Sequence, residues 1–314
     1  MDNNPLVSVG ILAYNSSKYI IDALESVKSQ TYQNIELIVS DDASTDNTVD
    51  ICREWIKENG DRFVNATLIT VEQNTGTSGN ANRIVNACKG EWFKVLAGDD
   101  ALFPDCIANF IKYIINHPGS KAVVGLIKRY YFILDDKNAV EDHLSDSFFS
   151  LSAEDQFKIL LHGNYYIPCS VFLNLAMINE VGGYDDKYGI LEDFPFYLKV
   201  LKAGYKFYKM DEFVQKYRMS DTNVYGNLIA LFNYRHQYYD YLVRRDMCFQ
   251  YYSFRERIRT HTRLVTYWIM DKLGLQKNTS YNRFVKKNLH GVFAFLTFDY
   301  DVFRSFFLRR MGKL

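Results

Sequence analysis

Residues 92–100 read WFKVLAGDD, an apolar run that ends in two adjacent aspartates, Asp99 and Asp100. A strand that stops in two carboxylates, with no basic residue next to them in the sequence, places like charges side by side. That arrangement is costly unless a cation neutralises it, and oxygen ligands at a strand end suit a hard divalent ion such as Mn2+ or Mg2+. A second pair, Asp41 and Asp42, ends an earlier apolar run. The two pairs predict a metal-assisted site for a phosphorylated ligand.

The bulk composition is that of a folded protein. The chain has 314 residues, 48% hydrophobic and 24% charged, enough for one large domain or one domain plus an appendage. Its five cysteines form no CxxC pair, which fits a reducing compartment and argues against zinc. The N-terminus lacks the features of a signal peptide, and no apolar run is long enough to span a membrane. We therefore expect a cytoplasmic protein, either soluble or peripheral at the inner membrane face.

Charge divides the chain unevenly although the net charge is zero. From Thr222 to the end there are 16 lysines and arginines and only 6 acidic residues. Such asymmetry is typical of a basic surface for an anionic partner, and we do not expect that partner to be nucleic acid. We place a domain boundary here, with one domain over residues 1–221 and a basic, aromatic-rich helical extension over residues 222–314.

The first hundred residues alternate between strand and helix patterns. The expected strands cover residues 6–12, 35–39, 67–71 and 92–96. Single helices between them predict right-handed crossovers and an α/β fold with a mostly parallel sheet flanked by helices. Ligands bind such sheets at the carboxyl ends of the strands. The polar residues expected there are Tyr14 and Asn15, Asp41 and Asp42, Asn74 to Ser78, and Asp99 and Asp100.

The next hundred residues show a less regular pattern. We expect a helix from Pro104 to about His117, strands over 122–127 and 130–134, an acidic loop over 136–152, and a helix over 153–161. A turn at residues 182–185 then precedes Glu192, Asp193 and a helix with apolar periodicity.

Several short motifs occur in a consistent order along residues 5–220. They are VSVGILAYN (7–15), ESV and SQTY (25–27 and 29–32), IVSDDASTD (38–46), KGEW (89–92), GDD followed by Pro104 (98–100), GGYD (182–185) and Glu192-Asp193. Each is weak alone, but the ordered set resembles the family 2 glycosyltransferases with the GT-A fold. The resemblance implies inverting transfer of one sugar from a nucleotide-diphosphate sugar, with uridine the base expected from family frequency.

The resemblance also implies a role for each matching residue. The nucleotide-binding positions would be Ala13, Tyr14, Asn15, Asp42, Asn74, Asn82 and Asp99, with Asp42 at the base edge and Asp99 facing the ribose or sugar. Asp100 would be the direct ligand of Mn2+ or Mg2+ at the donor diphosphate. Asp193 would be the catalytic base, with Glu192 beside it. This chemistry is consistent with the residue types, since a metal stabilises the leaving diphosphate and a carboxylate takes the acceptor proton.

Two positions depart from the family pattern. Members often carry arginine before the asparagine of the helix after the third strand, and here Ala81 occupies that position, with Arg83 nearby. Many members also have a histidine metal ligand after a Tyr-Arg pair, and here Tyr217-Arg218-Met219 is followed by Ser220.

Other interpretations remain open at this point. The acidic pairs could simply cap helices or complement helix dipoles. A nucleotidyltransferase also uses a parallel sheet and carboxylate-bound metal, but the segment after the first strand lacks its glycine-rich, basic phosphate loop. A receiver domain using Asp41 and Asp42 would be shorter than this chain. A non-catalytic sugar-binding scaffold is suggested by Ala81 and Ser220.

The C-terminal segment, residues 283–314, carries an apolar stripe with basic residues off the stripe. The stripe comprises Phe293, Leu296, Tyr300, Phe303, Phe307, Met311 and Leu314. Such a helix could dock on the catalytic domain or on a second subunit as a homodimer, or it could lie on an anionic membrane surface. The membrane interpretation fits a lipid-linked glycan acceptor, such as an O-antigen or capsule unit at the inner face of a bacterial membrane.

Overall fold

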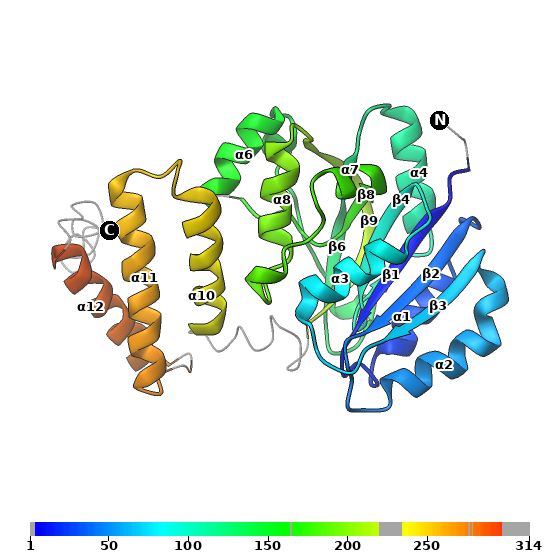
Figure 1. Ribbon diagram of the computed structural model, residues 1–314, viewed down its shortest axis with the longest axis horizontal. Coiled ribbons are helices and arrows are strands. Elements are labelled where there is room, and N and C mark those ends of the chain that lie inside the picture. The colour runs from blue at the N-terminus through cyan, green and yellow to red at the C-terminus, as the bar shows by residue number, and fades with distance from the viewer. Residues whose placement is uncertain (1–3, 164, 220–233, 276, 278, 297–314) are drawn as a thin grey trace. The chain divides into compact units, whose positions relative to one another are not determined.

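The computed structural model describes residues 4–163, 165–219, 234–275, 277 and 279–296 (Figure 1). The chain divides into two compact units, Met1–Met219 and Ser220–Leu314. Each unit is considered by itself below.

The first half of unit 1 is a parallel α/β arrangement, as expected. Four strands lie in the order β3-β2-β1-β4 and all pair in parallel. Their bounds are β1 (Val7–Ala13), β2 (Ile35–Asp41), β3 (Asn65–Thr70) and β4 (Trp92–Ala97). The connecting helices are α1 (Ile20–Lys28), α2 (Thr48–Asn59), followed by the 3-10 turn η1 (Gly60–Arg62), and α3 (Gly76–Ala87). The carboxyl ends of these strands therefore meet at one edge of the sheet.

The sheet continues beyond β4 in the order β8-β6-β9-β5. Strand β8 is antiparallel to β4 and β6, β9 is parallel to β6, and the short strands β5 and β7 are antiparallel to β9 and β6. Their bounds are β5 (Ala101–Leu102), β6 (Ala122–Tyr131), β7 (Val140–Glu141), β8 (Val171–Asn174) and β9 (Phe207–Met219). The helices of this half are α4 (Cys106–Asn116), α5 (Asp146–Phe149), α6 (Ala153–Leu161), α7 (Leu175–Glu180) and α8 (Asp193–Lys202), with 3-10 turns η2 (Asp136–Asn138) and η3 (Asp186–Tyr188).

Three sequence expectations for this half are wrong in detail. The two strands expected over 122–134 are the single strand β6, and β8 and β9 were not expected. The acidic loop expected over 136–152 contains η2, β7 and α5. Helix α5 forms because Phe148 and Phe149 are buried, and their rings pack against Tyr165.

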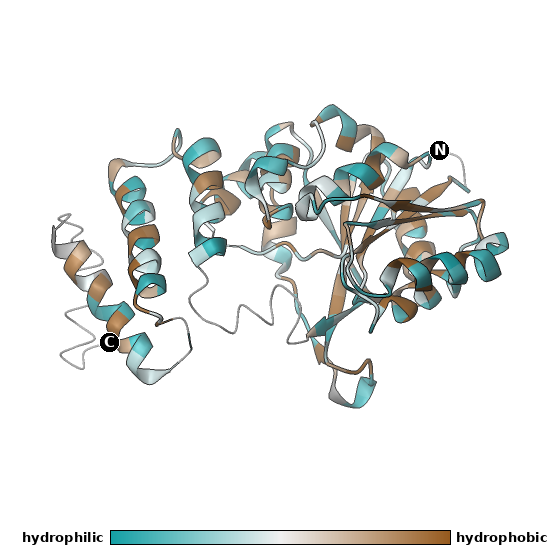
Figure 2. Cartoon of the chain, turned by 60° about the horizontal axis from the view of Figure 1, so that its bottom comes forward, coloured by the Kyte–Doolittle hydropathy of each residue, from teal (hydrophilic) through white to brown (hydrophobic). Residues whose placement is uncertain are grey.

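Opposite faces of the sheet are covered by different helices. Alternate residues of β1 and β2, beginning with Val7 and Ile35, pack in one core with α1, α2 and α4. On the other face, a Cβ on Gly10 of β1 would lie 2.4 Å from Ile84 of α3, so this close packing of α3 requires glycine. Figure 2 shows the apolar strands inside and hydrophilic residues on the outer helix surfaces. Helix α3 is thereby fixed beside the ends of β1 and β2.

Stacked aromatic rings join β4, β8 and α4. The ring of Phe172 stacks on Trp92, with centroids 5.1 Å apart, and on Phe110, with centroids 4.8 Å apart. All three side chains are buried. Burial of each such ring contributes about 1.5–3 kcal/mol, so this cluster firmly anchors the strand that carries the acidic pair.

Unit 2 consists of helices in the part that the structure describes. They are α10 (Tyr234–Val243), continued by the π-helical turn η4 (Arg244–Cys248), α11 (Phe254–Lys272) and α12 (Ser280–Leu296). Asp240 of α10 is buried and pairs with Arg244, at 2.9 Å, and with Arg263 of α11. Val285 and Leu289 of α12 pack on Tyr267 and Met270 of α11.

None of the helices in the described residues has the length and apolar character needed to cross a membrane. The apolar stripe expected over residues 293–314 lies largely outside the described residues, which end at Leu296.

Candidate active site

The acidic pair after β4 lies in a tight turn at the carboxyl edge of the sheet. Gly98 donates its N–H to the Leu12 carbonyl of β1 at 2.8 Å, and Asp100 N–H donates to the Ala97 carbonyl at 3.1 Å. Asp100 is 1% exposed, whereas Asp99 is half-buried. Burial and the neighbouring Asp99 raise the pKa of Asp100 to about 8. Burial likewise raises the pKa of Asp99.

Both oxygens of Asp100 accept hydrogen bonds from β9. Gln215 Nε2 donates to Oδ2 and the Arg218 backbone N–H donates to Oδ1, each at 2.8 Å. Behind Gln215 lies Lys94 of β4, which is 0% exposed and donates to Gln215 Oε1 at 2.8 Å. The acidic pair therefore has cations near it that the local sequence did not indicate. Lys94 was overlooked because it occupies an apolar run, and Arg218 because it lies 118 residues further along the chain.

The Arg218 side chain links four segments around this turn. Its guanidinium donates to the Asp99 carbonyl at 2.7 Å, the Phe132 carbonyl at 2.5 Å and Asp22 Oδ2 at 2.5 Å. It also lies over the ring of Tyr19, 4.3 Å from the centroid. Arg218 is 2% exposed, so its bonds to the two carbonyls are shielded from water, while its partner Asp22 remains half exposed.

Another predicted acidic pair, Glu192 and Asp193, lies at the N-terminus of α8. Asp193 is the first helical residue, and its Oδ1 accepts the Phe194 N–H at 2.6 Å. Both side chains are half-buried. Burial and the adjacent Asp193 raise the pKa of Glu192 to about 8, and burial raises the pKa of Asp193.

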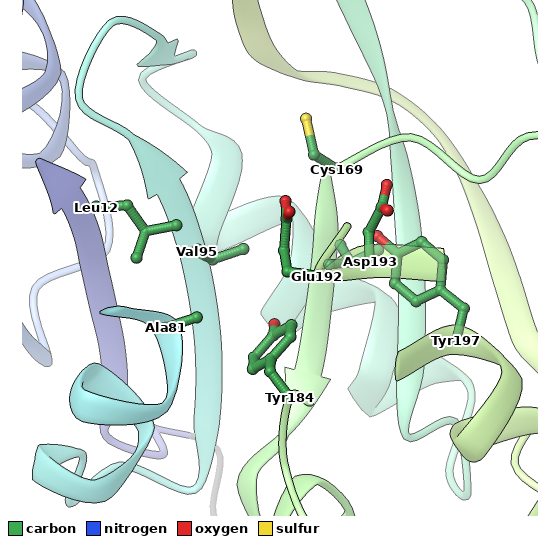
Figure 3. Close-up of a pocket in the computed structure, with 9 residues that line it drawn as sticks. Leu12, Ala81, Val95, Cys169, Tyr184, Glu192, Asp193 and Tyr197 are labelled. Atoms are coloured by element: carbon green, nitrogen blue, oxygen red, sulfur yellow. The ribbon is translucent and has the colours of Figure 1, made fainter. Parts of the chain in front are cut away.

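Both carboxylates line a small pocket of about 30 Å3 (Figure 3). They point toward the side of the pocket that Cys169 lines, and Ala81, Tyr184 and Tyr197 lie at its other walls. Leu12, Val95 and Val171 complete it from strands β1, β4 and β8. The pocket is large enough for ordered water and lies at the carboxyl ends of β1 and β4.

Cys169 connects the surroundings of the Asp99–Asp100 pair to those of the Glu192–Asp193 pair. Its Sγ lies 3.5 Å from Gln215 Nε2, and it also faces the pocket of Glu192 and Asp193. Burial, together with the charges of Asp100, Asp193 and Glu192, raises the pKa of the Cys169 thiol to about 12. The structure thus brings together two carboxylate pairs that are about ninety residues apart in sequence.

Of the predicted nucleotide-binding residues, Ala13 ends β1, and Tyr14 and Asn15 follow it. The Ala13 carbonyl accepts the Asp42 N–H at 2.9 Å, which joins the ends of β1 and β2. Asn15 adopts φ +49°, and its Oδ1 accepts the Thr45 N–H at 2.8 Å. The Tyr14 side chain is 51% exposed, so its ring is accessible at this edge.

Asp42 is strongly engaged by the segment after β3. Its carboxylate accepts the N–H groups of Thr75, at 3.0 Å, and Gly76, at 2.9 Å, and pairs with Arg83 at 3.1 Å. Asn74 donates to the Asp42 carbonyl at 3.0 Å. Asp42 therefore organises the loop that begins α3, and Arg83 supplies its counter-charge.

Asn82 joins α3 to the turn that precedes Glu192 and Asp193. Its Oδ1 accepts the Tyr184 N–H at 2.8 Å, and its Nδ2 donates to the Tyr184 carbonyl at 2.9 Å and to Asp186 at 3.0 Å. The neighbouring Gly183 has φ +61°, and a Cβ there would lie 2.8 Å from Asn82 Oδ1. This contact links α3 to the segment that leads to Glu192 and Asp193.

The acidic pair after β4 fits a divalent ion held jointly by protein and substrate. In the part of the chain that the structure describes, no group of three or more histidine, cysteine, aspartate or glutamate residues could enclose a metal. Mg2+ and similar ions are commonly bound by one or two carboxylates together with substrate phosphates, and Asp99 with Asp100 offers that donor set. Ser220, at the family's histidine position, lies outside the described residues.

Solved structures share this fold. The Staphylococcus aureus protein TarS 1-349, in complex with UDP-GlcNAc, superimposes with a TM-score of 0.58 at 16% identity, covering 92% of this chain and 80% of that one. The mannosyltransferase PcManGT from Pyrobaculum calidifontis, in complex with GDP-Man and Mn2+, gives 0.55 at 16% identity, covering 95% and 88%. The fold and the acidic edge of the sheet define a protein of the GT-A class.

Sequence comparison then identifies the family. The profile described as glycosyl transferase family 2 matches residues 8–178, and the chain belongs to this family. An uncharacterized glycosyltransferase from Rickettsia typhi is 27% identical over 209 residues, covering 64% of this chain and 60% of that protein. The putative teichuronic acid biosynthesis glycosyltransferase TuaG of Bacillus subtilis is 26% identical over 225 residues, covering 71% and 82%.

Proposed function

We propose that this chain is an inverting glycosyltransferase that moves one sugar from a nucleotide-diphosphate sugar, with UDP as the nucleotide, to a hydroxyl group of a glycan. The observation that carries the proposal is that Gln215, which bonds Asp100, lies 3.5 Å from the Sγ of Cys169, and that Cys169 lines the pocket of Glu192 and Asp193 at the carboxyl edge of the sheet. One pair suits the diphosphate and the other suits the acceptor. The UDP-GlcNAc complex of TarS supports the choice of nucleotide.

The donor would bind across the ends of β1, β2 and β4. The exposed Tyr14 ring and Asn15 would form the wall for the base, while Asp42 and Asn74 would shape the loop next to it. Asp99 would face the ribose or sugar, and Asp100 would hold Mn2+ or Mg2+. When bound, the ion would stabilise the negative charge that grows on the leaving diphosphate. The Mn2+ in the PcManGT complex supports this assignment.

The acceptor hydroxyl would enter beside α8. Asp193 would accept its proton, and Glu192 would orient it from the same side of the pocket. The raised pKa of Asp193 makes this carboxylate a better proton acceptor than an ordinary aspartate. Direct attack on the donor with a single base, without a protein nucleophile, inverts the anomeric centre.

For the acceptor, we propose a lipid-linked glycan of a bacterial surface polysaccharide. The name of TuaG supports a role in polysaccharide synthesis. The excess of basic residues in unit 2 supports contact with an anionic membrane surface, where such an acceptor would be located.

A donor panel tests the proposal. The full chain is heated with UDP-, GDP- and dTDP-sugars in the presence of Mn2+, and stabilisation by one nucleotide class is the expected result, because binding to the folded state raises the melting temperature. Product analysis with that donor should then detect nucleoside diphosphate. A chain that instead released inorganic diphosphate from a nucleoside triphosphate and a sugar 1-phosphate would be a nucleotidyltransferase, and an absence of stabilisation by every donor would contradict the proposal.

A further inference from the structure

One lysine, Lys94, is buried in the middle of the sheet. Lys94 occupies β4, between β1 and β8, and is 0% exposed. Its ammonium donates to the Val95 carbonyl at 2.6 Å and to Gln215 Oε1 at 2.8 Å. Burying a charged group among strands is costly, and a methionine of similar length would fill the same volume without that cost. Packing alone therefore does not account for a lysine at this position.

Gln215 joins this ammonium to the acidic pair. Its side chain is 1% exposed, and its Nε2 donates to Asp100 Oδ2 at 2.8 Å. Lys94 Nζ donates to the amide oxygen of Gln215 and the amide nitrogen donates to Asp100, so the amide is held from both ends. The three side chains form a one-directional chain of hydrogen bonds, which we call the Lys94–Gln215–Asp100 relay.

A second buried glutamine shows what a purely structural role looks like. Gln156 is buried, like Gln215, but its amide bonds the backbone of Phe148 and Phe207. Gln215 instead bonds the side chains of Lys94 and of Asp100, the proposed metal ligand, and its Nε2 also lies 3.5 Å from Cys169 Sγ. The difference lies in the partners, because burial and residue type are the same.

We propose that Lys94 and Gln215 are positioning residues for the acidic pair. Lys94 supplies a built-in counter-charge, and Gln215 links it to Asp100. When no divalent ion is bound, the ammonium stabilises the carboxylates through the Gln215 amide and keeps Asp100 in one orientation. The Arg218 N–H holds the other oxygen, so both oxygens stay in place. This inference rests on the proposed function, because it assumes that Asp99 and Asp100 receive a cation with the donor diphosphate.

The relay predicts an energetic coupling between Lys94 and the metal. Removing the ammonium takes away one of the two cations beside the acidic pair, Arg218 being the other, so the protein without metal should lose stability. A divalent ion added with UDP would then replace the missing charge and restore part of the loss. If Lys94 or Gln215 only filled the core, its replacement would lower stability by the same amount with and without the ion.

The experiment measures the melting temperature of the full chain with UDP alone and with UDP plus Mn2+. The variants are Lys94→Met and Gln215→Met, with Gln156→Met as the matched control. We expect Lys94→Met and Gln215→Met to increase the Mn2+-dependent rise by about 3 °C or more over wild type. Gln156→Met should lower both temperatures and leave the rise unchanged. Lys94→Arg, which keeps the charge, should also leave it close to that of wild type.

The outcomes separate this inference from the proposed function. Equal Mn2+-dependent rises in wild type and all variants would overturn the relay and leave the proposed function intact. The absence of any rise in every protein would overturn both. If Lys94→Met folds only in the presence of Mn2+ and UDP, the inference is supported, and Gln215→Met tests it with the lysine in place.

Discussion

At the residue scale, the molecule concentrates carboxylates whose pKa values lie above their ordinary range. Glu192 and Asp100 have pKa values raised to about 8, and the pKa of Asp193 is raised as well. Burial is the first cause in each case, and a neighbouring carboxylate adds to it for Glu192 and Asp100. Acidic residues perturbed in this way are typical of functional sites.

Asp193→Asn tests the proposed base. The asparagine Oδ1 can still accept the Phe194 N–H, so the start of α8 should be preserved. We expect kcat to fall by about 10²–10⁴-fold because proton removal from the acceptor is lost, with little change in the KM for the donor. Release of nucleoside diphosphate measures this. Glu180→Gln, an exposed carboxylate bonded to Tyr205, is the control, and an unchanged rate in Asp193→Asn would exclude this residue as the base.

Glu192 makes folding stability depend on pH. The carboxyl group loses its proton near pH 4.5 when the chain is unfolded but only near pH 8 when folded. The unfolded state therefore binds fewer protons between these values, and the free energy of unfolding should fall as pH rises from about 4.5 to about 8. Urea denaturation at several pH values measures the slope. Glu192→Gln should make the decline shallower, and an identical slope would contradict the assignment.

At this scale the sequence revealed the acidic residues but few of their partners. The acidic pairs, Tyr14 and Asn15 were all visible as polar residues after apolar strands. Gln215 and Arg218, which bond Asp100, come from a strand more than a hundred residues later, and only the fold brings them near. Arg83 was noticed but not assigned to Asp42, because its reach depends on the loop after β3.

At the element scale, α3 contacts the turn before η3, which precedes α8 in the chain. Asn82 makes three hydrogen bonds across this contact, and Gly183 adopts the left-handed conformation beside it. Ala81, on the same helix, lines the pocket of the second acidic pair. Helix α3 thus contacts both the Asp42 loop and the proposed acceptor pocket.

Asn82→Ala tests whether this contact positions the proposed base. We expect the variant to lose about 1–3 kcal/mol of stability, because partly buried polar groups lose their partners. Its kcat should fall more than its donor KM rises, since the Glu192–Asp193 segment shifts relative to the donor. Asn59→Ala removes one bond to the Trp55 carbonyl at the end of α2 and is the matched control. Equal effects of both variants on kcat would argue against a positioning role.

The elements that the sequence predicted well are those with local signals. The first four strands were expected within about two residues of their observed ends, because each apolar run is followed by turn residues. Strand β6 was expected as two strands because Lys128 and Arg129 interrupt its apolar pattern. Both charges are balanced across the chain, Lys128 by Glu141 at 2.9 Å and Arg129 by Asp142 at 2.6 Å. Such long-range pairs leave no local signal.

At the scale of the whole molecule, the chain joins an acidic α/β unit to a basic helical one. Helix α12 carries the exposed side chains Tyr281, Phe284 and Val292 together with the exposed cations Arg283 and Lys287. Composition alone predicted this asymmetry.

Binding to anionic vesicles tests the role proposed for the basic unit. We expect the full chain to sediment with vesicles containing phosphatidylglycerol and to be released as salt increases, because surface charge interactions are screened over about 8–10 Å at 0.1–0.15 M salt. The double variant Arg283→Glu and Lys287→Glu should bind more weakly. Vesicles of phosphatidylcholine are the control. Equal binding to both vesicle types would show that the cations are not involved.

The lysine inside the sheet affects how an inactive form of this protein should be prepared. Neutralising Asp100, the proposed metal ligand, would here remove the carboxylate that Gln215 links to the buried Lys94, and uncompensated buried charges cost several kcal/mol. If the Asp100→Asn variant were inactive, an activity assay would not distinguish a loss of catalysis from a loss of folding. For trapping substrates or for complementation assays, Asp193→Asn is the safer template.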